Sequence, residues 1–160
     1  MKRLISASLL ILLAGCGGSS ARTTQADRTK AAILRVLQED NRLCEGVKKL
    51  SPGTPPSQVA LAVGEYCDEA GRLDLSECPP DFRVAYRHHI EAWREAQGVI
   101  KELPDTFLQG FLMGAINGFL RNEADGGTAR VEGQLRRALE GIRETFHEVE
   151  RIGVTHGAAL

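Results

Sequence analysis

The residues with the most chemical potential in this sequence lie close together. From Cys78 to Trp93 the chain reads CPPDFRVAYRHHIEAW, which combines a thiol, an acid, two adjacent histidines and the single tryptophan. Thiolate and imidazole groups bind metals and take part in acid–base chemistry, so these side chains are candidates for a metal or catalytic site. The two prolines followed by an acid also indicate the beginning of a helix. Proline needs no N–H partner in a first turn, and a negative charge complements the helix dipole there.

Helical spacing assigns these side chains to faces. The apolar and aromatic positions recur every three or four residues, which places one set on a single inner face: Phe82, Tyr86, His89, Trp93, Ala96 and Ile100. His88 is turned about 100° away, so the two histidines cannot share one small metal site. We expect His89 to be a hydrogen-bonded core residue between Tyr86 and Trp93. The alternative is a metal- or small-ligand pocket formed by Tyr86, His89 and Trp93.

Sharper catalytic signatures do not occur in the sequence. It has no Cys-x-x-Cys-His haem motif, no Gly-x-Ser-x-Gly turn and no phosphate-binding loop. Glu144 and His147 form one Glu-x-x-His pair, but a di-iron bundle needs two, so the pair indicates a solvated helix face. HEVER at 147–151 lacks the second histidine of a zinc protease. We expect no catalytic residue, no bound metal and no cofactor.

The beginning of the chain predicts export and lipid anchoring. The letters MKR precede about a dozen apolar residues, a pattern typical of a secretory signal and too short to span a bilayer. LAGC at 13–16 resembles the lipobox of bacterial lipoproteins. The resemblance implies that a signal peptide of residues 1–15 is removed and that Cys16 is acylated. Gly17 follows in place of an aspartate, which by the same resemblance favours the outer membrane, with the protein facing the periplasm.

The remaining residues predict one helical domain, 25–155, on a flexible tether of residues 16–24. Apolar spacing of three, four or seven residues predicts helices over 24–50, 57–71, 80–103, 105–121 and 128–152. No segment alternates as a strand would, and short links favour antiparallel neighbours. The predicted fold is therefore an all-α antiparallel bundle of four to five helices.

Charge and glycine patterns limit the partners. The net charge of −1 becomes −3 without the signal, because two of the 20 basic residues and none of the 21 acids lie in it. Without long runs of one sign, this predicts neither nucleic-acid binding nor a polybasic membrane patch. Gly110, Gly114 and Gly118 repeat every four residues. They favour close contact with another helix, while a membrane-surface or partner-binding face is the alternative.

Three cysteines follow Cys16, namely Cys44, Cys67 and Cys78. An oxidising periplasm favours one disulfide and one free thiol. Cys44 and Cys67 lie on the inner faces of the first two predicted helices and are the favoured pair. Cys67 with Cys78, which would close a short loop, is the alternative.

A second resemblance concerns the stretch from Cys78 to Trp93. CPPDF, followed by Ala85-Tyr86, His89 and Ala92-Trp93, resembles small uncharacterised bacterial lipoproteins and exported helical proteins. That resemblance implies no activity. Together with the lipobox it favours a lipid-anchored, non-catalytic interaction or structural module, held at the membrane for a protein partner.

Overall fold

The computed structural model describes residues 24–51, 53–103 and 131–159. Within these ranges the chain forms four α-helices and no strand: α1 (Gln25–Lys48), α2 (Pro56–Ala70), α3 (Pro80–Lys101) and α5 (Val131–Thr155). The predicted all-α bundle is confirmed, and the helix bounds fall within a few residues of the predicted ones. The signal, Cys16, most of the tether and the glycine-rich helix expected at 105–121 lie outside the described residues.

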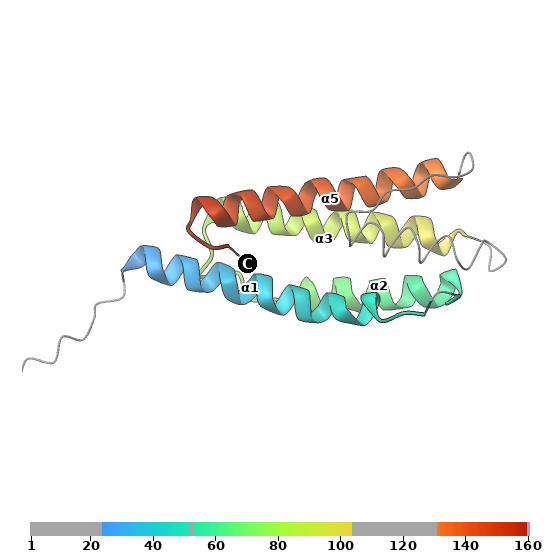
Figure 1. Ribbon diagram of the computed structural model, residues 1–160, viewed down its shortest axis with the longest axis horizontal. Coiled ribbons are helices and arrows are strands. Elements are labelled where there is room, and N and C mark those ends of the chain that lie inside the picture. The colour runs from blue at the N-terminus through green and yellow to red at the C-terminus, as the bar shows by residue number, and fades with distance from the viewer. Residues whose placement is uncertain (1–23, 52, 104–130, 160) are drawn as a thin grey trace, which may run out of the picture.

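Each of the four described helices runs antiparallel to the next described one along the chain. Figure 1 shows α1 and α2 side by side in one layer and α3 and α5 in the other. The two layers meet mainly through α2 and α3, while α1 and α5 touch at few points. The beginning of α1, the α2–α3 connection, the beginning of α3 and the end of α5 therefore share one end of the bundle.

The beginning of α1 is fixed by a capping box. Thr24 Oγ1 accepts a hydrogen bond from the backbone N–H of Asp27, and Asp27 Oδ2 accepts one from the backbone N–H of Thr24, at 3.1 and 3.0 Å. Such a cap stabilises a helix by about 1 kcal/mol. The α3 helix begins differently, with Pro80 in its first turn as the sequence predicted.

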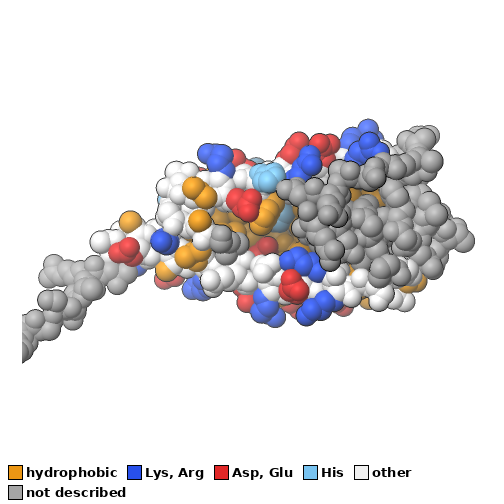
Figure 2. All heavy atoms as spheres, viewed as in Figure 1, with side chains coloured by type: hydrophobic (Ala, Val, Ile, Leu, Met, Phe, Trp, Pro, Cys, Tyr) orange, Lys and Arg blue, Asp and Glu red, His pale blue; other side chains and the backbone are white. Residues whose placement is uncertain are grey.

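The core collects the apolar stripe of each helix. All six inner positions predicted for α3 are buried. On α5 the stripe of Leu135, Leu139, Ile142 and Val149 is buried, and Phe146 is half-buried. Figure 2 shows one face of the molecule, with side chains of both charges interspersed over its described part and hydrophobic side chains visible between the layers.

One close approach joins the two layers at Gly64 of α2. A Cβ added to Gly64 would meet the side-chain amide of Gln97 on α3. Gln97 uses that amide to donate to the backbone carbonyl of Ala60 at 3.0 Å. The missing side chain of Gly64 thus makes room for a hydrogen bond between helices.

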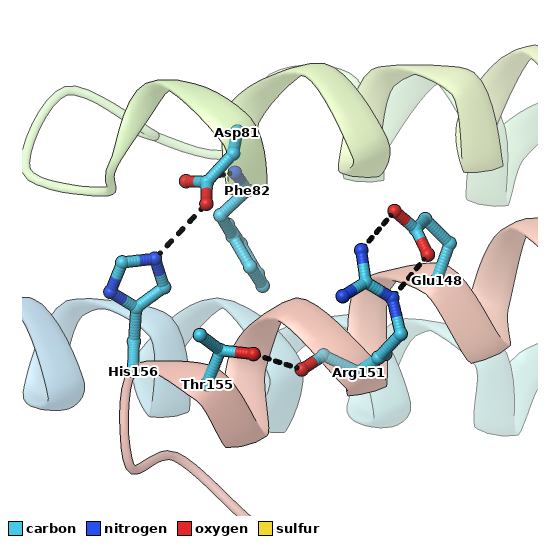
Figure 3. A network of polar contacts seen from close by, with 6 residues as sticks. All are labelled: Asp81, Phe82, Glu148, Arg151, Thr155 and His156. Carbon is cyan, nitrogen blue, oxygen red and sulfur yellow. Dashed lines mark hydrogen bonds and ion pairs between the residues drawn. The ribbon is translucent and has the colours of Figure 1, made fainter.

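The end of α5 is fastened to the beginning of α3 (Figure 3). Asp81 Oδ2 lies 3.2 Å from Nε2 of His156, and Asp81 Oδ1 accepts from the backbone N–H of Phe82 at 2.8 Å. These contacts, the His156 bond first, lower the pKa of Asp81. Gly157 has a φ of 76°, which lets the chain turn so that the N–H of Ala158 closes the helix on the carbonyl of Gly153.

Among the residues that the structure describes, none of the helices combines the length and apolarity needed to cross a membrane.

Candidate functional site

The three residues of the predicted ligand pocket lie together inside the bundle. Tyr86, His89 and Trp93 are 2%, 3% and 3% exposed, and they point from α3 toward the other helices. His88 is exposed, as its position on the helix predicted. The question is therefore whether the buried trio leaves any group free to bind a ligand.

Both ring nitrogens of His89 are engaged. The indole N–H of Trp93 donates to Nε2 at 3.2 Å, and Nδ1 lies 3.1 Å from the hydroxyl of Thr145 on α5. Since an indole nitrogen can only donate, Nε2 must be the acceptor and Nδ1 must carry the proton. The Thr145 hydroxyl donates in turn to a carbonyl of its own helix. Burial lowers the pKa of His89 to about 4, so the ring is neutral near neutral pH.

A metal at His89 would have to displace the Trp93 N–H from the lone pair of Nε2. In the described ranges, no three His, Cys, Asp or Glu side chains converge as metal ligands would. The Glu144–His147 pair lies on the exposed side of α5, where His147 Nδ1 contacts Glu150 at 3.3 Å. The geometry around His89 is that of a hydrogen-bonded core.

A buried carboxylate that helical spacing did not single out lies next to this core. Asp40 of α1 is 5% exposed. Its Oδ1 accepts from the hydroxyl of Tyr66 on α2 and from the hydroxyl of Tyr86 on α3, each at 2.8 Å. Burial raises the pKa of Asp40, and the two phenol hydrogen bonds oppose that rise. Burial, together with the nearby Asp40 charge, also raises the pKa of both phenols.

Asp40 and His89 belong to two hydrogen-bonded groups that one aromatic contact joins across the bundle. Tyr66, bonded to Asp40, packs edge-on against Trp93 with ring centroids 5.1 Å apart, and Trp93 is bonded to His89. Each of the four described helices contributes: α1 through Asp40, α2 through Tyr66, α3 through Tyr86, His89 and Trp93, and α5 through Thr145. The chain leaves no buried side-chain polar atom unpaired in the described part.

A signal for Asp40 was present in the sequence. It falls four residues after Val36 and four before Cys44, in the middle of the apolar stripe of α1. A lone acid at such a position indicates a buried, hydrogen-bonded carboxylate. Its partners could not be named, because Tyr66 and Tyr86 come from two other helices.

An open hollow of the described surface lies elsewhere, on the outer side of α3. It has a volume of about 520 Å³ and is bounded by α3, the end of α2 and the α2–α3 connection. We call it the arginine groove. Its apolar floor includes Ala70, Leu73, Leu75, Tyr86 and Ile90, and its charged side chains are Arg83, Arg87, Arg94, Asp74 and Glu91.

The position of the arginine groove follows from helix geometry. Arg83, Arg87 and Arg94 are separated by four and seven residues, so they lie within about 40° of one another around α3. The sequence contained this stripe, but it reads as an ordinary solvated face. The opposite wall comes from residues 71–76, which only the fold brings alongside.

The three cysteines are buried and free. Cys44, Cys67 and Cys78 are 7%, 1% and 4% exposed and form no disulfide in the structure, neither in the favoured pairing nor in the alternative one. Burial raises the pKa of Cys44 and of Cys67 to about 11, which keeps both as unreactive thiols at neutral pH.

Comparison with known proteins finds no match for this chain, whether among family models, curated proteins or solved structures.

Proposed function

We propose that this protein is a lipid-anchored cell-envelope protein that acts as a non-catalytic interaction module in the periplasm. One contrast carries the proposal. The acid–base groups of the interior, Asp40 and His89, bind to other core side chains. The arginine groove, a hollow open to solvent, includes three guanidinium groups, which bind anions and rarely exchange protons at neutral pH. This division suits binding better than catalysis.

The anchor is the second part of the proposal and rests on the sequence. LAGC at 13–16 predicts removal of residues 1–15 and acylation of Cys16. Each buried acyl CH₂ contributes about 0.8 kcal/mol, so several chains hold a protein at a bilayer durably. Gly17 favours the outer membrane as the place of anchoring.

Fractionation of cells tests the anchor. Cys16→Ser should move the protein from the membrane to the soluble or unprocessed fraction and abolish labelling with palmitate. The matched control is Cys78→Ser, which changes a thiol in the helical part and should leave fractionation and labelling as in the parent. A parent protein that takes up no label and fractionates like Cys16→Ser would show that the protein is not lipid-anchored.

Cross-linking in intact cells tests the interaction role. A partner that cross-links to the parent should be lost when Arg83 and Arg87 are both changed to Gln. It should be kept when Arg136 and Arg137, two exposed arginines on α5, are changed instead. Equal capture by both variants would show that the interaction surface is not the arginine groove.

A disulfide between Cys44 and Cys67 remains a prediction for an oxidising compartment, and the free thiols of the structure do not support it. Peptide mapping of protein isolated without reductant distinguishes the cases. A Cys44–Cys67 peptide, a Cys67–Cys78 peptide or three alkylated peptides would identify the favoured pair, the alternative pair or no disulfide.

A further inference from the structure

The arginine groove presents its positive charge as a line. From Arg83 to Arg94 the stripe runs along about 16 Å of α3, and Arg83 and Arg87 are about 6 Å apart along the helix axis. The floor beside them is apolar, with Leu73 and Leu75 on the α2–α3 connection and Ile90 on α3. A ligand in this groove would contact guanidinium groups on one side and apolar side chains on the other.

The guanidinium groups of the groove are free to bind an anion. Some other surface arginines are bound by a glutamate three residues away, as in Arg42 with Glu39 and Arg151 with Glu148, both at 2.6 Å. Within the described part of the chain, Arg83 and Arg87 have no acid within ion-pair distance, although Glu91 follows Arg87 by one turn. The third arginine, Arg94, makes one long hydrogen bond, at 3.5 Å, to the carbonyl of Cys67.

Among the described residues, the two acids of the groove form no ion pair with Arg83, Arg87 or Arg94. Asp74 Oδ1 accepts from the backbone N–H of Ser76, which holds the carboxylate in its own turn and lowers its pKa. The backbone carbonyl of Asp74 accepts from Arg35 of α1, and Arg35 also pairs with Glu77 at 3.6 Å. These contacts connect the wall of the groove to α1.

We propose that the arginine groove binds a phosphate group of a ligand, with Arg83 and Arg87 as its main contacts. The apolar floor of the groove contacts the hydrocarbon part of the ligand attached to that phosphate. A single arginine satisfies the two oxygens of a carboxylate in a bidentate pair. Two arginines one turn apart suit a group whose oxygens point in more than one direction, and the tetrahedral phosphate of a monoester or a diester offers this where a planar carboxylate does not. This deepens the proposed function, on which it rests for the groove being the interaction surface.

Two sources of phosphate are within reach. The groove is at the end of the bundle where α1 begins. The eight residue-to-residue steps from Cys16 to Thr24 extend at most roughly 28 Å. If Cys16 carries lipid, the groove is held near phospholipid headgroups. A soluble phosphate compound of the envelope offers the same chemistry without a membrane.

Arginine footprinting of the full chain separates the sources. Phenylglyoxal modifies accessible guanidinium groups, and mass spectrometry gives the rate at each arginine. The chain is compared in neutral detergent with and without inorganic phosphate at equal ionic strength, and in vesicles of phosphatidylcholine with and without phosphatidylglycerol. Protection slows the reaction by the factor 1 + [L]/Kd, so a Kd of about 5 mM gives about threefold slowing in about 10 mM phosphate.

The internal references are Arg136 and Arg137, which are exposed and unpaired among the described residues. Slowing of Arg83 and Arg87 by phosphate, with both references unchanged, supports a site for soluble phosphate. Slowing only with phosphatidylglycerol vesicles supports a headgroup site. Unchanged rates in all conditions, or equal slowing at the references, overturn the proposal.

A matched pair of variants completes the test. Arg94, the third arginine of the groove, should also react more slowly in the condition that protects Arg83 and Arg87. This slowing should disappear in the Arg83→Gln, Arg87→Gln variant and persist in the Arg136→Gln, Arg137→Gln variant, which has the same change in charge. Persistence in both would overturn the assignment of Arg83 and Arg87. The footprint does not depend on acylation or on a protein partner. The phosphate-binding proposal can therefore be overturned while the lipid anchor and the protein partner are supported. The footprint can also support phosphate binding if the anchor and the partner are not found.

Discussion

The indole N–H of Trp93 donates a hydrogen bond to Nε2 of His89, which lies one helical turn earlier on α3. Because the donor is an N–H, the ring of His89 must offer a lone pair at Nε2, and its own proton is on Nδ1 beside Thr145. A protonated ring would place one N–H against another. The bond therefore defines a histidine whose neutral form is part of the packing.

Replacing His89 with Ala should destabilise the protein. The change leaves the Trp93 N–H without its acceptor and opens a space beside Phe146, whose ring centroid lies 5.3 Å from that of His89. We expect a loss of about 2–4 kcal/mol and a Tm lower by roughly 6–12 °C. The exposed neighbour is the control, and His88→Ala should change stability by less than about 0.5 kcal/mol. Equal, small effects of both would show that His89 is not a packing residue.

Stability should fall in mild acid because of His89. Its pKa is about 4 in the folded protein and 6.5 in the unfolded chain, so between these values the unfolded chain binds the proton first. The free energy of unfolding then decreases as pH falls from 6.5 to about 4, by roughly 3 kcal/mol. His89→Gln, which does not titrate, should show a smaller decrease over this window. Urea unfolding at several pH values measures the difference. Parallel curves for parent and variant would contradict the assignment.

Asp40 should behave as an acceptor shared by two donors. Asp40→Ala leaves the hydroxyls of Tyr66 and Tyr86 unpaired inside the bundle and should cost about 2–5 kcal/mol. Asp40→Asn keeps one oxygen acceptor and should be milder.

The stability of the parent and that of Asp40→Asn should also depend differently on pH. Because the pKa of Asp40 is raised, the folded protein holds this proton more tightly than the unfolded chain, and stability is lost as pH rises through the folded pKa. Asp40→Asn removes that loss. The stability of the variant relative to that of the parent should therefore be higher at about pH 8 than at about pH 4.5. Thermal unfolding at the two pH values gives the comparison, and an equal difference at both would show that Asp40 has an ordinary pKa.

Two glycine substitutions should give different results although both lie in helices. Gly98→Ala on α3 places its methyl group in open space and should stabilise by up to about 1 kcal/mol through helix propensity. Gly64→Ala gains the same propensity, but the new methyl displaces the Gln97 amide from the carbonyl of Ala60. We expect Gly64→Ala to be less stable than Gly98→Ala by about 1 kcal/mol. Chemical unfolding of both variants tests this, and equal gains would show that the Gln97 bond contributes nothing.

The inner face of each helix could be predicted from spacing alone. On α3 the aromatic and apolar positions recur every three or four residues, which was enough to place His89 inside and His88 outside. The partners of His89 were only partly predictable. Trp93 lies one turn away on the same helix, whereas Thr145 is brought from α5 by the fold.

The arginine groove could not be predicted, for a different reason. A stripe of arginines on an exposed helix face has the same sequence whether it faces open solvent or a wall. The wall of residues 71–76 follows from how α2 ends and α3 begins. Spacing within one helix carries no information on this.

The shared oxygen of Asp40 also bears on which arrangements of the bundle are allowed. Apolar stripes attract without direction, so two helices can slide by one turn, about 5.4 Å, and still bury most of the same surface. Hydrogen bonds at 2.8 Å from α2 and α3 to one atom of α1 do not survive such a slide. The hydrogen bonds to Asp40 thus fix the axial positions of α1, α2 and α3 relative to one another. Without Asp40, the helices should keep their backbone structure while sampling several offsets, which would appear as collapsed dispersion in the methyl NMR spectrum with an unchanged far-UV circular dichroism.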